Sequence, residues 1–328
     1  MHTKPITSST TLKLAKHLLG FALLAGLHGA ALADWPDKPI TMVVPYAAGG
    51  GVDNIARIVM PALAKELGQT VVVNNKPGAN ANIGSSYVAH AAPDGYTFLV
   101  GATYLASNRV LMTDMNYDPL NDLTPVSRLG LSPAVLVTGS KLPIKSVKEL
   151  IDYGRAHPTE TSYASVGVAS LNPLIFVRNT GIKAVPVLYK GGGQALPDLI
   201  SGRVTFMVTP VSEVLPTIEG GNLRALAVTG LGRLKALPDV PTFAQEGVAD
   251  LAAVIWWGVF SPRNVPEAIN QRLARALEAV LKKPDVIAAL GTFSIESAHL
   301  GMADFDAFYR TEMKFFADTA SAFNLQPN

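Results

Sequence analysis

Two glycine-bearing segments contain the residues of this chain best suited to binding chemistry. The first, residues 45–53, reads Pro-Tyr-Ala-Ala-Gly-Gly-Gly-Val-Asp, and the second, residues 74–84, reads Asn-Asn-Lys-Pro-Gly-Ala-Asn-Ala-Asn-Ile-Gly. Glycines allow the backbone to approach a bound anion closely and to direct N–H donors at it. No Gly-Lys-Ser/Thr follows the first segment, so a nucleotide-binding P-loop is poorly supported. A carboxylate suits the same donors and carries less charge.

Asp53, at the end of the first segment, has two interpretations. It could cap the N-terminus of the helix that follows, or it could contact a ligand directly.

Residues typical of catalysis are sparse. The chain has no cysteine, which excludes disulfides, thiol catalysis and zinc–thiolate sites. No Gly-x-Ser-x-Gly motif occurs, and His90, His157 and His299 lie in separate contexts. The sequence therefore indicates a protein that is not an enzyme and has no metal or cofactor. A periplasmic hydrolase or isomerase remains an alternative, because fold alone does not determine function.

Residues 1–33 have the order of an export signal. Lys4, Lys13 and Lys16 precede an apolar stretch, 18–32, and the small-residue triplet Ala31-Leu32-Ala33 ends it. We expect cleavage after Ala33 and a periplasmic location. An uncleaved anchor is disfavoured because the apolar stretch is short for a bilayer span.

The mature chain would be close to neutral. Loss of three lysines leaves 24 of the 27 basic residues against 25 acidic ones. Because the mature chain has no basic block, nucleic acid is not an expected partner. The chain is also expected to be a monomer.

The remaining sequence alternates apolar runs with amphipathic stretches, which predicts an α/β protein with largely parallel sheets. Strands are expected at 39–44, 70–73, 97–101, 162–164, 184–188, 204–208 and 225–228. Helices are expected at 52–67, 83–91, 146–156, 170–180, 192–201, 211–219, 266–281, 284–290 and 303–322. Both glycine segments would then join a strand to the following helix, where open α/β sheets bind ligands.

Two extended apolar segments, 123–138 and 253–262, interrupt this alternation. Such segments suit a chain that crosses twice between two lobes and acts as a hinge. We therefore predict a first lobe formed by 34–136 and 255–328, and a second lobe formed by 137–254.

Several short motifs occur in the order found in one receptor family. They are Pro45-Tyr46-x-x-Gly-Gly-Gly-x-Asp53, Asn75-Lys76-Pro77-Gly78-Ala79-Asn80-x-Asn82-Ile83-Gly84, Pro93-Asp94-Gly95-Tyr96-Thr97, Tyr117-Asp118-Pro119, Tyr189-Lys190-Gly191-Gly192, Leu223–Thr229 and Leu237–Thr242. Together they cover essentially the whole mature chain and resemble the Bug-type receptors of tripartite tricarboxylate transport systems. The resemblance implies a two-lobed, type II-like periplasmic binding protein with a ligand cleft between its lobes.

The resemblance also implies ligand-binding positions. In the first lobe they are Tyr46, Ala48, Gly49, Gly50, Ala79, Asn80 and Ile83, which would hold a carboxylate through backbone amides and bridging waters. In the second lobe they are Ser165, Gly167, Ser170, Tyr189, Gly191, Gly192 and Thr209. Two of these assignments have alternatives: Ser165 or Ser170 could cap the following helix, and Tyr189 could pack within its own lobe.

Departures from the family pattern bear on specificity. The family commonly has aspartate at Thr209, a natural partner for ammonium, so amino-acid ligands are disfavoured here. Arg109 stands where a proline is usual and could either pair with a second ligand carboxylate or lie on the surface. Trp256 and Trp257 could line the cleft or pack in the hinge.

The expected function is capture of a small mono- or dicarboxylate by lobe closure and its delivery to the membrane permease subunits of a tripartite tricarboxylate-type transporter. A sensor that signals to another protein is the alternative with the same binding chemistry.

Overall fold

The protein is described by a computed structural model covering residues 35–166, 171–189, 192–230, 232–248 and 254–322. The predicted signal peptide lies outside these ranges, so its cleavage site stays a prediction. None of the described helices has the length and apolar composition needed to cross a membrane.

One mixed sheet organises the fold, in the order β2-β1-β3-β9-β4-β7-β5-β6, with β8 paired to β4. The strands are β1 (Ile40–Val44), β2 (Val71–Asn75), β3 (Thr97–Ala102), β4 (Leu123–Gly139), β5 (Ser162–Val166), β6 (Val185–Tyr189), β7 (Phe206–Pro210), β8 (Leu223–Val228) and β9 (Val254–Pro262). Pairing is parallel within β1, β2 and β3 and again within β5, β6 and β7. The predicted rhythm of two parallel groups is therefore confirmed.

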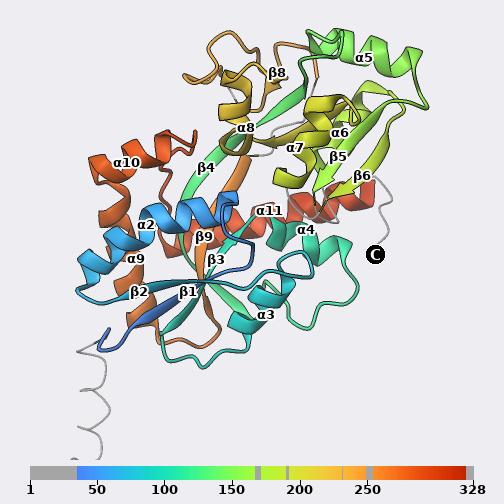
Figure 1. Cartoon of the computed structure of the whole chain (residues 1–328). Coiled ribbons are helices and arrows are strands. Elements are labelled where there is room, and N and C mark those ends of the chain that lie inside the picture. Colours follow the sequence, from blue (N-terminus) through green and yellow to red (C-terminus); the bar gives the residue numbers. More distant parts are fainter. Residues whose placement is uncertain (1–34, 167–170, 190–191, 231, 249–253, 323–328) are drawn as a thin grey trace, which may run out of the picture.

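The two extended segments predicted as crossings are the long strands β4 and β9, which pair antiparallel with each other. Strand β4 also pairs with β7 and β8, whereas β9 also pairs with β3. These two strands thus connect the two parallel groups (Figure 1). The lobe boundaries assigned from the sequence remain a prediction.

Helices surround the sheet in two groups. They are α2 (Gly51–Leu67), α3 (Asn82–Ala89), α4 (Tyr104–Leu111), α5 (Val147–Ala156), α6 (Leu171–Thr180), α7 (Gly192–Ser201), α8 (Val211–Glu219), α9 (Glu267–Leu281), α10 (Pro284–Gly291) and α11 (Met302–Ala322). Figure 1 shows α5, α6, α7 and α8 in the upper part of the view and α2, α3 and α9 in the lower part. Helix α4 was not predicted from the sequence.

The elements form because their apolar residues face a common interior. Helix α2 buries Ile55, Val59 and Leu63, which recur at helical spacing, and it ends at Gly68 with a left-handed φ of 67°. Strand β1 is buried along most of its length because it lies between β2 and β3. This packing fixes the carboxyl ends of β1 and β2, from which both glycine segments continue.

Candidate functional site

The first glycine segment links β1 to α2 and is organised by Asp53. The Asp53 carboxylate accepts the N–H of Gly49 at 2.9 Å, Arg57 Nε at 2.7 Å and Asn75 Nδ2 at 2.9 Å. Burial alone would raise the pKa of this carboxyl, but the bonds from Arg57, Gly49 and Asn75 outweigh burial and lower it. Asp53 is thus an ionised loop-organising residue. It does not cap α2, because the N–H that it accepts belongs to Gly49, which precedes the helix, and no side chain caps α2.

The start of α2 leaves backbone donors for a bound anion. No side chain caps the helix at Gly50, and the bond from Asn54 N to Gly50 O is 2.9 Å long. The N–H groups of Gly51, Val52 and Asp53 therefore have no partner within the helix. Together with the helix dipole, such groups favour a carboxylate or another anion.

The second glycine segment links β2 to α3 and has an unusual backbone. Ala79, Asn80 and Ala81 have φ values of 43°, 52° and 72°, in the left-handed region that non-glycine residues rarely adopt. A run of such residues is costly unless the surroundings hold it, and this kind of strain concentrates at ligand-binding loops.

Asn108 of α4 supplies that support. Its Nδ2 donates to the Asn80 carbonyl at 2.7 Å and to Asn82 Oδ1 at 3.1 Å, while its Oδ1 accepts Asn80 Nδ2 at 2.7 Å. The Asn108 side chain is fully buried. Because one amide satisfies both the backbone and the side chain of Asn80, it holds the loop in a single conformation.

The two loops lie against each other. Asn75 Nδ2 donates to the Tyr46 carbonyl at 3.0 Å, so the end of β2 is tied to the first loop. Gly84 in α3 packs on both loops, since a Cβ built there would lie 2.8 Å from Pro45 Cβ and 2.8 Å from the Lys76 carbonyl. Glycine is required at this position because any larger residue would separate the loops.

Glu213 reaches the first loop from the opposite parallel group. It lies in the first turn of α8, and its Oε2 accepts Thr209 Oγ1 at 2.9 Å. A Cβ built on Gly51 would lie 3.7 Å from Glu213 Oε1 and 3.5 Å from Trp257 Cζ2, and one built on Gly192 would collide with Glu213 Oε2. One carboxyl group therefore meets the start of α2 and the start of α7.

The environment of this carboxyl is poorly solvated. Burial raises the pKa of Glu213, and the bond from Thr209 opposes that shift. Burial raises the pKa of the Tyr46 phenol, and the negative charge of the nearby Glu213 raises it further. Tyr46 itself packs edge-to-face on Tyr104, with ring centroids 5.5 Å apart.

The predicted first-lobe positions gather on these loops. Ala48, Gly49, Ala79 and Ile83 are exposed, whereas Tyr46, Gly50 and Asn80 are partly buried. Their contacts with a ligand remain a prediction.

The predicted second-lobe positions are described only in part. Ser165 is buried in β5, Thr209 is buried in β7 and bonded to Glu213, and Gly192 begins α7 beside Glu213. Tyr189 donates its hydroxyl to Asp198 of α7 at 2.7 Å, a contact within its own group, as its alternative interpretation expects. Gly167, Ser170 and Gly191 lie outside the described residues.

Arg109 and the two tryptophans have defined partners. Arg109 Nε pairs with Asp118 at 3.2 Å, with both side chains partly exposed. Trp256 is fully buried, packs on Phe260 and Phe305, and donates Nε1 to Glu312 at 3.0 Å. Trp256 therefore packs in the interior, and Trp257 is the tryptophan that borders the first loop.

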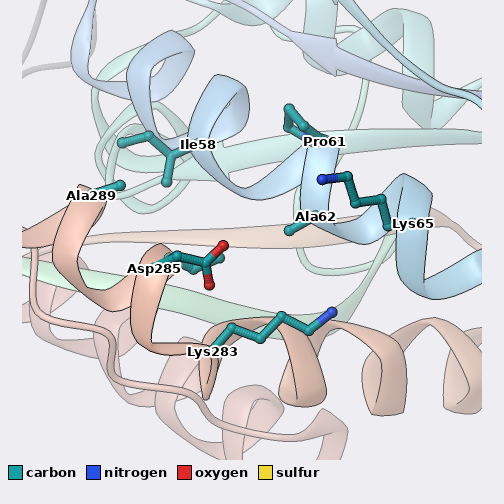
Figure 2. A pocket seen from close by; sticks show the side chains of 8 residues that line it. Ile58, Pro61, Ala62, Lys65, Lys283, Asp285 and Ala289 are labelled. Atoms are coloured by element: carbon teal, nitrogen blue, oxygen red, sulfur yellow. The ribbon is translucent and has the colours of Figure 1, made fainter.

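Two surface hollows occur away from these loops. One of about 300 Å³ lies between α2 and α10 and is lined by Ile58, Pro61, Ala62, Lys65, Lys283, Asp285, Val286 and Ala289 (Figure 2). The other, of about 320 Å³, is lined by Arg109, Met112, Met115, Tyr117, Asp118 and Pro119. Neither hollow includes a residue of the glycine segments.

Sequence reasoning missed three residues of this site: Asn108, Gly84 as a spacer, and Glu213. Position 84 needs a glycine because of its packing against Pro45 and Lys76, which is visible only in the folded structure. Glu213 occurs in a stretch, Val211–Glu219, whose only readable signal was helical.

Comparison with known proteins identifies the family of this chain. The profile described as "Tripartite tricarboxylate transporter family receptor" (TctC) matches residues 55–320. Protein BugT of Bordetella pertussis (strain Tohama I) is 37% identical over 275 residues, which are 82% of this chain and 84% of BugT.

Two solved structures share the fold. Rhodopseudomonas palustris Rpa4515 with adipate has 33% identity and a TM-score of 0.86, over 90% of this chain and 100% of the other. Periplasmic binding protein BugD has 29% identity and a TM-score of 0.83, over 90% of this chain and 100% of the other. These relatives are solute-binding proteins and not enzymes. The chain, with its α/β periplasmic binding protein fold, therefore belongs to the receptor family of tripartite tricarboxylate transporters.

Proposed function

We propose that this protein is a periplasmic receptor that captures a small carboxylate and delivers it to the permease subunits of a tripartite tricarboxylate-type transporter. The observation that carries the proposal is the contact between two strand-to-helix loops, which Asn75 and Gly84 hold side by side. The free N–H groups at the start of α2 and the exposed loop around Asn80 then form one anion-binding surface. Rpa4515, a relative with adipate in its structure, supports a carboxylate as the ligand.

In this proposal the carboxylate binds first to residues 46–50 and 79–83 and bridging waters complete its contacts. The segment around Ser165, Gly167 and Ser170, with Tyr189, Gly191, Gly192 and Thr209, then closes over it. Closure requires that the ligand bind the shut form more tightly than the open form. The mature chain begins at residue 34, after export, and its lobes are 34–136 with 255–328 and 137–254.

The test is a ligand screen on purified mature protein. Mono- and dicarboxylates of increasing length are added, and the melting temperature and heat of binding are recorded. A receptor gains stability in proportion to the logarithm of ligand concentration above Kd and converts nothing. Small-angle scattering with the best ligand should show compaction. The proposal would be overturned if no carboxylate stabilised the protein, or if the protein converted a carboxylate into a product.

A further inference from the structure

Glu213 presents a carboxyl group directly beside the proposed carboxylate site, which is chemically unexpected. Its Oε1 faces the position of a Gly51 Cβ at 3.7 Å, and Gly51 is the first residue of α2, whose first N–H groups have no partner within the helix. An ionised Glu213 would repel an anion bound at the start of α2, and the low-dielectric surroundings would strengthen the repulsion.

Nothing in the described part of the chain compensates this carboxyl with a positive charge. The described ion pairs do not include Glu213, and its described hydrogen bond comes from the neutral Thr209 hydroxyl at 2.9 Å. The residues near it from other elements are Gly51, Tyr46 and Gly192, none of which carries a positive charge. A poorly solvated carboxyl with one neutral donor keeps spare acceptor capacity.

The residues that Glu213 meets at the two helix starts have no side chains. Glycine stands at both 51 and 192, so no side chain separates the carboxyl from either helix start. Thr209 is buried and orients the carboxyl through Oε2, which leaves Oε1 directed toward the first loop. A ligand whose carboxylate occupies the N–H groups of α2 would place its adjacent substituent near Oε1.

Resting on the proposed function, we propose that Glu213 determines specificity by binding an ammonium group, so that the ligand is a zwitterionic amino carboxylate. The ammonium supplies the positive charge that this carboxyl lacks, and a charge-assisted N–H···O bond forms at Oε1. On this proposal a threonine at position 209 is compatible with an amino-acid ligand, because Glu213 supplies the acid and Thr209 holds it.

Matched ligand pairs test this proposal by titration calorimetry. Each pair differs only in hydrogen or ammonium at one carbon: propionate and alanine, succinate and aspartate, glutarate and glutamate, adipate and 2-aminoadipate. The wild-type protein should bind the amino member of at least one pair about 10-fold or more tightly. In Glu213→Gln this preference should fall to about 3-fold or less. Glu213→Asp, which retains the charge, should keep part of it.

Glu219→Gln is the matched control, because it makes the same change at the exposed end of the same helix. It should keep the wild-type preference. If carboxylates bind the wild type but the amino members bind no better, the inference about Glu213 is overturned and the proposed function stands. Tighter binding of the dicarboxylate at lower pH would mean that a protonated Glu213 donates to it, which also overturns the inference. If no member of any pair binds, the proposed function itself fails.

Discussion

Asn75 donates its side-chain amide to Asp53 at 2.9 Å and so joins the end of β2 to the first turn of α2. This bond connects the two glycine-bearing loops through an ionised carboxylate that also fixes Gly49. The arrangement of the loops therefore depends on the side chain of Asp53, which is not among the predicted ligand-binding residues.

Asp53→Ala should weaken both stability and binding. The substitution leaves the Gly49 N–H without its acceptor and removes one of the two hydrogen bonds that Asn75 Nδ2 donates. Hydrogen bonds to charged groups contribute about 1.5–3 kcal/mol each. We expect a loss of about 2–3 kcal/mol in the free energy of unfolding, measured by urea titration. Asp114→Ala, at an exposed position, is the control. Equal stability of the two variants would contradict the organising role of Asp53.

Asn108→Ala should release the loop formed by Ala79, Asn80 and Ala81. Without the bonds at 2.7 Å to Asn80, nothing described here offsets the cost of three left-handed residues in sequence. Carboxylate affinity should fall by about 10-fold or more, because the binding conformation must then be re-formed on binding. Exposed Asn116→Ala should bind as the wild type does. An Asn108→Ala protein with unchanged affinity would show that the loop needs no such support.

Gly84→Ala should push the loops apart. The added methyl group would meet Pro45 Cβ and the Lys76 carbonyl at 2.8 Å, and the backbone must shift to relieve this overlap. Such overpacking costs about 1–3 kcal/mol, and carboxylate binding should weaken with it. Gly291→Ala, which has open space around it, serves as the control and should leave both quantities nearly unchanged. Wild-type affinity in Gly84→Ala would mean that the spacing of the loops is unimportant.

The stability contributed by Glu213 should depend on pH. Burial raises its pKa, so the unfolded chain ionises first as the pH rises above the usual value of 4.5. Below pH 4.5 Glu213 is protonated in both the folded and the unfolded protein. Above it the unfolded chain ionises first, so the folded protein loses stability until the pH exceeds the pKa of Glu213 in the folded protein. Replacement by glutamine removes this effect, because a neutral amide does not titrate.

Calorimetric melting of wild type and Glu213→Gln between pH 4.5 and neutrality measures that dependence. The melting temperature of Glu213→Gln relative to wild type should increase with pH, whereas that of Glu219→Gln should not. A constant difference across the range would show that the Glu213 carboxyl does not titrate differently on folding.

Much of the fold could be predicted from local patterns. Apolar runs and helical spacing located every strand and all helices but α4, because these signals reside within single segments. Helix α4, Tyr104–Leu111, was missed because its buried residues include the polar Ser107 and Asn108, which interrupt the apolar helical spacing. Strand β2 extends to Asn75 because β1 pairs with it that far, which its polar residues do not indicate.

The candidate site was predictable only where its residues lie close in sequence. The two loops carry their own glycine signals, but Asn108 and Glu213 act through contacts with residues distant along the chain. Nothing in the neighbouring sequence distinguishes an asparagine that holds a loop, such as Asn108, from one that is simply exposed to solvent. The same is true of a glutamate in the first turn of a helix, such as Glu213. Tertiary packing alone brings these groups to the loops.

The most direct measurement is a crystal structure of the mature protein with a carboxylate that the calorimetric screen identifies. The carboxylate should lie within hydrogen-bonding distance, about 3 Å, of main-chain N–H groups at the start of α2 and in residues 79–83. An anion bound elsewhere, or contacting only one of the two loops, would contradict the assignment.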